Sequence, residues 1–349
     1  MRIAVYALAK NELKHAAEWA DCCQDADVRV VTDTGSSDGT QGVLMQHGVT
    51  VCTGYVVPWR WDDAHNLSLY HVPPDVDVCI RLDLDERLQP GWRAAVERAW
   101  QPGVTQLRYR YIWSWTADGK PGLEFLCDRV HARSGYRWAS ATHEGLIRWH
   151  GESVQAVAQG LEIHHHRDAG KRHKSDLELL RVAVREAPHD ARTRWYLARE
   201  MDYCGMPEAA AEFASYLRMA GGSPTERAYA RRALARLTDN ESHMHAATQE
   251  APDEPDAWQL LAYAKYVEQD WEACAKFARR AIDAKGYSTH CTDPEARTKA
   301  LDLAAVSLWQ LGHKHDALAM ARQAAAQCPI DERLVGNVAA MEKSLAEAV

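Results

Sequence analysis

The chain has 349 residues, 46% hydrophobic and 26% charged, which is an ordinary globular composition at a length that predicts two domains. Its 49 acidic residues outnumber 41 Lys and Arg, giving a formal net charge of −8, which disfavours a surface dedicated to nucleic acid. There is no targeting signal, no apolar run approaching the ~20 residues of a membrane span, and no CxxC pair among nine cysteines, so we expect free thiols in a cytoplasmic protein.

The first part of the chain alternates predicted strands and helices. Strands are predicted at 2–10, 28–34, 49–55 and 76–85, and helices at 12–23 and 41–48. This alternation predicts a parallel α/β sheet, in which ligands bind at the carboxyl ends of the strands. Two polar clusters follow predicted strands, so we expect both to line one site.

The first cluster, DTGSSDGT at 33–40, places Asp33 and Asp38 around a Gly/Ser turn whose backbone N–H groups can face a ligand. The second, RLDLDE at 81–86, places Asp83 and Asp85 two residues apart, on the same side of an extended segment. Hard divalent cations prefer such carboxylate oxygens. Taken singly, each cluster is also compatible with a plain turn or a solvated strand end.

After about residue 175 the pattern changes to Ala-rich helices with an internal repeat. Segments 195–217, 258–282 and 301–325 align, with small residues at equivalent places: Ala198, Ala262 and Ala305 in the first helix, and Ala210, Cys274 and Ala317 in the second. These helix pairs resemble tetratricopeptide repeats, which stack into a solenoid with a concave face. They either pack on the first domain or hold an acceptor or partner.

Five motifs in order resemble family 2 glycosyltransferases of the GT-A (Rossmann-like) fold, in the branch with a tetratricopeptide-like tail. They are YALAKNE, VVTDTGSSDGT, WRWDDAHNLSL, RLDLDERL and ATHEGL. The resemblance implies a GT-A nucleotide-sugar-binding domain at 1–170 and an all-α repeat domain at 171–349.

The resemblance also implies roles for the matching residues. Glu12 and Asp33 match family residues that contact the uracil and ribose of a UDP-sugar. The remaining implied donor contacts are Asp38, Asp63, Asn66 and Asp83. Asp83 and Asp85 match the DxD motif, with Asp85 as the direct metal ligand.

The segment from Asp62 to Asn66 departs from the family pattern, because His65 stands where Arg is usual. A neutral imidazole cannot replace Arg as a bidentate phosphate clamp.

Inversion at the anomeric carbon requires a base for the acceptor proton. Within THEGL, Glu144 is the first choice and His143 the second, with Asp128 as a third. Alternatively, His143 and Glu144 brace a loop.

Three histidines, His164, His165 and His166, end the first domain. On a strand His164 and His166 share one face. Because GT-A enzymes often complete the metal shell with a late histidine, the resemblance implies that one of the three joins Asp85 and Asp83. His164 and His166 are the named candidates, the choice among the three stays open, and a histidine ligand favours Mn²⁺ over Mg²⁺. The basic residues that follow either neutralise the pyrophosphate or form a solvated linker: Arg167, Lys171, Arg172, His173 and Lys174.

The predicted function is therefore a metal-dependent inverting transfer of a sugar from a UDP-sugar. A protein or peptide side chain held by the repeats is the favoured acceptor, followed by a saccharide and then a modified DNA base of phage type. The repeats can also form a homodimer. The alternatives are an inactive repeat scaffold that binds a protein partner and a nucleotidyltransferase. Several Trp residues either stack on the sugar or acceptor or are buried: Trp59, Trp61, Trp113, Trp115 and Trp138.

Overall fold

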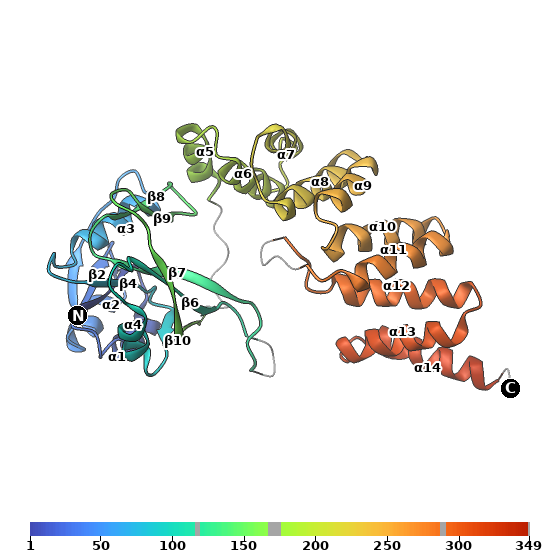
Figure 1. Cartoon of the computed structure of the whole chain (residues 1–349), viewed down its shortest axis with the longest axis horizontal. Helices are drawn as coiled ribbons and strands as arrows, with labels where there is room; N and C mark the ends of the chain where they lie inside the picture. Colours follow the sequence, from blue (N-terminus) through green and yellow to red (C-terminus); the bar gives the residue numbers. More distant parts are fainter. Residues whose placement is uncertain (116–118, 167–175, 287–290, 348–349) are drawn as a thin grey trace. The chain divides into compact units, whose positions relative to one another are not determined.

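The computed structural model describes residues 1–115, 119–166, 176–286 and 291–347. The chain divides into two compact units, Met1–Ala183 and Val184–Val349. The first is α/β and the second is all-α (Figure 1), which confirms the expected fold class. The basic cluster that begins at Arg167 lies outside the described residues. Within the described ranges, no helix is long and apolar enough to cross a membrane.

The second unit consists of antiparallel helix pairs. The three pairs predicted from the repeat are α6–α7 (Ala191–Tyr203, Ala209–Arg218), α10–α11 (Pro255–Val267, Trp271–Asp283) and α12–α13 (Ala296–Gln310, Lys314–Gln327). The unit also contains a pair that the alignment missed, α8–α9 (Pro224–Thr238, Ser242–Glu250), and the terminal helix α14 (Glu332–Ala346). Helix α5 (Leu177–Glu186) spans the division between the units.

Small residues let the helices of each pair approach closely. Of the small residues aligned in the repeat, Ala198, Ala262 and Ala305 are buried, and so are Cys274 and Ala317. In the first pair Ala210 is only half-buried, and its neighbour Ala209 is fully buried.

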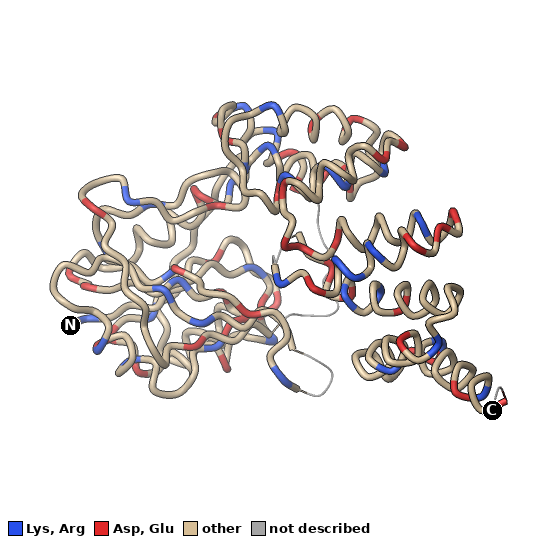
Figure 2. The backbone as a smooth tube through the Cα atoms, turned by 45° about the vertical axis from the view of Figure 1, so that its right-hand side comes forward, with Lys and Arg blue, Asp and Glu red and all other residues tan. Residues whose placement is uncertain are grey.

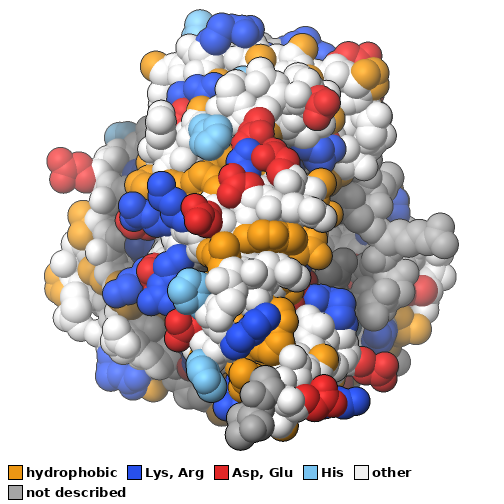
Figure 3. All heavy atoms as spheres, turned by 90° about the vertical axis from the view of Figure 1, so that its right-hand side faces the viewer, with side chains coloured by type: hydrophobic (Ala, Val, Ile, Leu, Met, Phe, Trp, Pro, Cys, Tyr) orange, Lys and Arg blue, Asp and Glu red, His pale blue; other side chains and the backbone are white. Residues whose placement is uncertain are grey.

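The surface of the helical unit is mixed in charge. Basic and acidic residues are interspersed along its helices (Figure 2), and several form ion pairs between neighbouring helices, such as Arg227 with Glu250. Hydrophobic side chains form bands between the charged ones in Figure 3. Tyr263, Val267 and Ile330 are among the exposed apolar residues of this unit.

The first unit is built on one eight-stranded sheet. The strand order is β3 (Thr50–Thr53), β2 (Val28–Asp33), β1 (Ile3–Ala9), β4 (Val78–Arg81), β7 (Glu124–Ala132), β6 (Gln106–Ile112), β10 (Gln155–His165) and β5 (Glu86–Leu88). A separate two-stranded sheet pairs β8 (Tyr136–Ala139) with β9 (Gly145–Arg148).

The parallel arrangement predicted from the sequence is correct for the four predicted strands, β3, β2, β1 and β4, and β10 also pairs in parallel with β6. The rest of the sheet is mixed. Strand β7 runs antiparallel to β4 and β6, and β5 runs antiparallel to β10. The physical reason is that β7 follows β6 after a short connection, without the helical crossover that parallel neighbours need. Because β2 and β4 both flank β1 in parallel, their carboxyl ends share one edge of the sheet.

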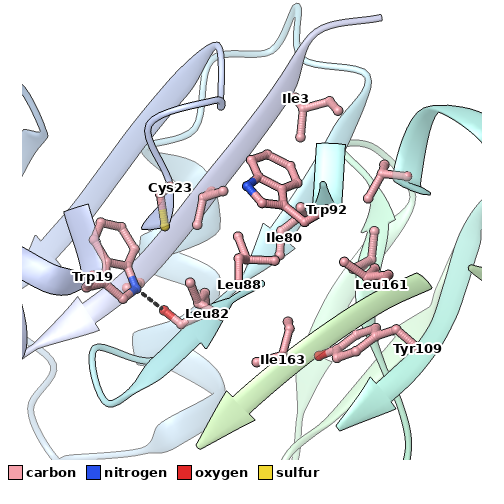
Figure 4. Close-up of a cluster of buried hydrophobic side chains, with 14 of the residues drawn as sticks. Ile3, Trp19, Cys23, Ile80, Leu82, Leu88, Trp92, Tyr109, Leu161 and Ile163 are labelled. Atoms are coloured by element: carbon pink, nitrogen blue, oxygen red, sulfur yellow. Dashed lines mark hydrogen bonds between the residues drawn. The ribbon is translucent and has the colours of Figure 1, made fainter. Parts of the chain in front are cut away.

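One face of the sheet packs against α1 (Leu13–Cys22) and α4 (Trp92–Ala99). Trp19 and Trp92 are fully buried in this core (Figure 4). The indole Nε1 of Trp19 donates to the carbonyl oxygen of Leu82 at 3.1 Å. Since Leu82 directly precedes Asp83, this bond anchors the chain where the acidic motif begins.

The acidic motif lies on a turn, and the extended segment predicted through residue 85 is wrong. Strand β4 ends at Arg81, and β5 begins at Glu86. The Glu86 N–H donates to the Asp83 carbonyl at 2.9 Å, and the Asp83 N–H donates to Glu86 Oε2 at 2.9 Å. These two bonds close the turn, so the side-chain alternation of a strand does not apply to Asp83 and Asp85.

Candidate active site

The carboxyl end of β2 carries a buried carboxylate with one oxygen unused. Asp33 Oδ1 accepts bonds from Gly35 N at 3.0 Å, Ser36 N at 2.9 Å and Gln41 Nε2 at 2.6 Å. Burial opposes the charge, but bonds from Ser36, Gly35 and Gln41 outweigh it and lower the pKa of Asp33. Oδ2 is buried and has no hydrogen-bond partner among the residues that the structure describes. The Asp33 Oδ2 atom can therefore accept a hydrogen bond from an N–H or O–H group of a ligand.

The loop after β1 is fastened to the turn that follows β2. Asn11 N donates to Ser36 Oγ at 2.8 Å, and Glu12 N donates to Thr40 Oγ1 at 2.9 Å. Asp38 completes the connection, because its carboxylate accepts from Leu13 N at 3.1 Å and from Thr40 Oγ1 at 2.6 Å. Asp38 therefore holds the loop after β1 against the turn after β2. Glu12 is the residue directly before α1.

The acidic turn after β4 is held by two arginines and by Glu86. Asp83 pairs with Arg81 at 2.7 Å and lies 3.6 Å from Arg129. Glu86 is 1% exposed, and its Oε1 accepts from Tyr111 Oη at 2.6 Å and from Arg129 at 2.9 Å. Burial, followed by the charge of Asp83, raises the pKa of Glu86 despite the opposing charge of Arg129.

Glu86 is a residue that sequence reasoning missed. Its only signal was its position directly after the second aspartate. Its side chain bonds to the Asp83 backbone and so sets the shape of the turn.

Asp85 faces a histidine from β10. His165 Nε2 lies 3.5 Å from Asp85 Oδ2, and His165 Nδ1 lies 3.1 Å from the Trp113 carbonyl oxygen. Because a carbonyl only accepts, Nδ1 carries the proton in the neutral ring and Nε2 presents its lone pair to the carboxylate. Burial opposes the charge on His165, but the bonds to Asp85 and Trp113 outweigh it and raise the pKa of the ring.

At this separation either a proton or a metal ion can lie between the ring nitrogen and the carboxylate oxygen. Donation of the second ring nitrogen to a carbonyl is the usual arrangement of metal-bound histidine. Asp85 and His165 therefore fit a borderline divalent cation such as Mn²⁺. Among the described residues, no group of three or more His, Cys, Asp and Glu side chains could hold a metal ion. A cation at this position therefore needs further ligands from water or substrate phosphates, as Mg²⁺-type sites do.

The other two histidines of the run make different contacts. His164 Nε2 lies 3.3 Å from Glu162, and its ring packs edge-on against Trp115. His166 reaches Asp85 through its backbone, whose N–H donates to the Asp85 carbonyl at 2.7 Å. The sequence prediction paired His164 and His166 with the metal, whereas the ring that lies against Asp85 is that of His165.

Helix α3 (Trp61–Tyr70) carries the segment that departs from the family pattern. Asp62 is buried in a two-point pair with Arg60, and Asp63 is exposed. Asn66 bonds to both backbone groups of Trp138, at 2.9 Å each. Asn66 therefore links α3 to β8 through these two hydrogen bonds.

Glu144 lies in the connection between β8 and β9, and its side chain contacts a buried histidine, His65. Glu144 Oε1 is 3.1 Å from His65 Nε2, which is also 3.0 Å from Arg81. Burial opposes the Glu144 charge, but the bond from His65 and the charge of Arg81 outweigh it and lower the pKa of Glu144 to about 2. Glu144 is thus a carboxylate throughout the physiological range.

The other two candidate bases lie in different settings. His143 is exposed and has a left-handed backbone with φ 49°. Asp128 is exposed on β7.

The candidate tryptophans divide into two groups. Trp113 stacks on His165 at 4.5 Å between ring centroids and is 39% exposed, as is Trp115. Trp138 is buried beside His65, and Trp59 packs edge-on against Trp61. The exposed indoles of Trp113 and Trp115 therefore flank the Asp85–His165 pair.

Comparison with known proteins gives no family for the chain. No family model matches it, and no curated protein does.

Several solved structures resemble parts of the chain. YrrB, a TPR protein with an unusual peptide-binding site, is 15% identical over 49% of this chain and 85% of its own, with a TM-score of 0.39. MamA is 13% identical over 43% of this chain and 79% of its own, with a TM-score of 0.34.

An enzyme structure also resembles part of the chain. Glucosyl-3-phosphoglycerate synthase from Mycobacterium tuberculosis, in complex with Mn²⁺, UDP and glucosyl-3-phosphoglycerate, is 22% identical, with a TM-score of 0.28. The match covers 32% of this chain and 44% of that enzyme. Because all three TM-scores are below 0.5, these likenesses carry no argument about function.

Proposed function

We propose that this protein is a metal-dependent, inverting glycosyltransferase that uses a UDP-sugar as donor. Residues 1–170 form the transferase domain and residues 171–349 form the helical repeat domain. The observation that carries the proposal is the facing pair of Asp85 and His165, two acceptor atoms 3.5 Å apart at the strand edge that also bears Asp33.

The nucleotide binds at the end of β2. The unused Oδ2 of Asp33 accepts a hydrogen bond from the base or ribose, and Glu12 completes this part of the site. Asp83, held by Arg81 and Arg129, contributes a carboxylate to the donor site.

Asp85 and His165 would hold a divalent cation, and Mn²⁺ is favoured over Mg²⁺ because it accepts imidazole better. Such a cation would supply positive charge to neutralise the diphosphate of the leaving UDP. The contacts of His165 support this residue over His164 as the histidine ligand.

Glu144 acts as the general base. It takes the proton of the acceptor hydroxyl as the acceptor oxygen forms a bond to the anomeric carbon. The bond from that carbon to UDP breaks on the opposite face, and UDP leaves with the electron pair. Trp113 and Trp115 offer exposed ring faces on which the sugar can stack.

The acceptor is a protein or peptide side chain, which the helical unit presents. Its support is a partly exposed aromatic and basic surface: Arg199 lies over the rings of Tyr196 and the exposed Tyr203, and the exposed Tyr263 stacks on Tyr266. Such surfaces bind extended peptides through stacking and hydrogen bonds.

Calorimetric titration of the full chain with UDP, with and without Mn²⁺, tests the donor site. The proposal expects UDP to bind in the presence of Mn²⁺ and to bind at least about tenfold more weakly in EDTA. An absence of UDP binding under both conditions would refute the donor-site assignment and would favour a scaffold that acts through its helical unit.

A further inference from the structure

We propose that His65 and Arg81 form a buried bridge that positions Glu144 against the acidic turn at Asp83. Both are positioning residues, since neither is placed against a reacting atom. The inference rests on the proposed function, in which Glu144 is the base.

The bridge consists of four side chains in close contact in the protein interior, in which Arg81 meets the His65 ring without a hydrogen bond and acts on Glu144 through its charge. Glu144 Oε1 lies 3.1 Å from His65 Nε2, and His65 Nε2 lies 3.0 Å from the Arg81 guanidinium. The same Arg81 nitrogen lies 2.7 Å from Asp83 Oδ1. His65 is 1% exposed and Arg81 is 6% exposed, so water does not screen these contacts.

The contacts fix the tautomer of His65. A single ring nitrogen cannot both donate to Glu144 and accept from Arg81. The Glu144 carboxylate can only accept, whereas Arg81 has Asp83 as its own acceptor. Nε2 therefore carries the proton and donates it to Glu144. Nδ1 is left bare, which agrees with its having no hydrogen-bond partner.

The ring is held in this orientation from both sides. Trp61 stacks on it with an interplanar angle of 24°, and the centroid of Trp138 lies 5.0 Å away. Burial, followed by the charge of Arg81, lowers the pKa of His65 and keeps the ring neutral. A neutral donor suits this position, because an arginine here would bring a second guanidinium against Arg81.

The charged and titratable groups around Glu144 come from several elements. They are His65 on α3, Arg81 on β4, Asp83 on the acidic turn and His143 on its own loop. His65 and Arg81 favour the carboxylate form, so loss of the His65 bond raises the pKa of Glu144. The acidic limb of kcat/KM then moves towards neutral pH, which a purely structural defect would not produce.

The test compares His65→Leu with His65→Gln, whose amide can still donate to Glu144. We expect His65→Leu to lower kcat by roughly tenfold to a hundredfold, to leave the KM for the UDP-sugar unchanged, and to shift the acidic limb upward. His65→Gln should return the acidic limb of the kcat/KM profile to the low pH of the parent and should restore most of kcat. If the acidic limb of the kcat/KM profile were the same in His65→Leu and the parent, the proposed role of His65 would be wrong.

A nuclear magnetic resonance measurement on the parent chain separates failure of the bridge from failure of the proposed function. The His65 ring signals are assigned by their loss in His65→Gln, among 17 histidines. At pH 8 we expect a proton on Nε2 and none on Nδ1. A proton on Nδ1 at that pH would overturn the inference whether or not the chain transfers a sugar.

Discussion

His165 Nε2 lies 3.5 Å from Asp85 Oδ2, across the edge where β5 pairs with β10. Because His165 Nδ1 faces the Trp113 carbonyl, the ring turns its lone pair toward the carboxylate. A proton or a metal ion can join these two atoms. The adjacent His164 offers a natural comparison because it faces Glu162.

The histidine run should show a position-specific metal dependence. Replacing His165 with Ala removes a proposed ligand, so the Mn²⁺ concentration that gives half-maximal UDP release should rise at least about tenfold. The matched control is His164→Ala, which should leave that concentration unchanged. If His164→Ala raised the required Mn²⁺ concentration and His165→Ala did not, the metal would lie on the strand face that His164 and His166 share.

Asp33→Asn should weaken UDP binding. The substitution removes the charge that accepts three bonds on Oδ1, and the new amide would offer hydrogens where acceptors are needed. We expect a loss of about 1–3 kcal/mol in the calorimetric titration. Asp21→Asn, at an exposed carboxylate on α1, is the control and should bind UDP as the parent does.

Glu86→Ala should destabilise the first unit by about 3 kcal/mol, because it leaves the Arg129 guanidinium and the Tyr111 hydroxyl without their shared acceptor. Urea unfolding followed by hydrogen exchange of the β1 amides measures this loss. Glu86→Gln retains an acceptor oxygen and should lose less. Equal stability of Glu86→Ala and the parent would contradict the bracing role.

The first unit should lose stability as the pH falls from 6.5 to about 4. Burial lowers the pKa of His131 to about 4, and the neutral ring accepts from Tyr6 and donates to the Ala132 carbonyl. The unfolded chain binds a proton near pH 6.5 and the folded chain does not, so the free energy of unfolding falls through this window, by about 3 kcal/mol from this residue.

Replacing His131 with Gln should flatten that pH dependence, whereas replacing the exposed His150 should not. Hydrogen exchange of the β1 amides between pH 4 and 7 measures both. The same slope in His131→Gln and the parent would show that other groups govern the acid sensitivity.

Local patterns predicted much of the fold. The alternation of short apolar strands with helices located β1, α1, β2 and α2. Small residues such as Ala198 and Ala262 located the helix pairs, because close helix packing requires them. The alignment did not include the α8–α9 pair, although this pair also packs through small buried residues such as Ala230 and Ala247.

The site was harder to predict, because its geometry depends on contacts between distant segments. The alternation rule placed His164 and His166 on the metal face, but the contact with Asp85 depends on how β5 pairs with β10. The bracing of Asp83 by Glu86 comes from a turn that replaced the expected strand. The His65–Glu144 pair joins residues 79 positions apart, and neither motif alone indicates it.

The most direct test of the proposed function is UDP release from a panel of UDP-sugars with Mn²⁺, Mg²⁺ or EDTA, comparing the parent with Asp85→Ala. The proposal predicts metal-dependent turnover of one donor by the parent, and a loss of at least about a hundredfold in the variant. Equal turnover by the two proteins, or release that persists in EDTA, would contradict a metal-dependent transferase centred on Asp85.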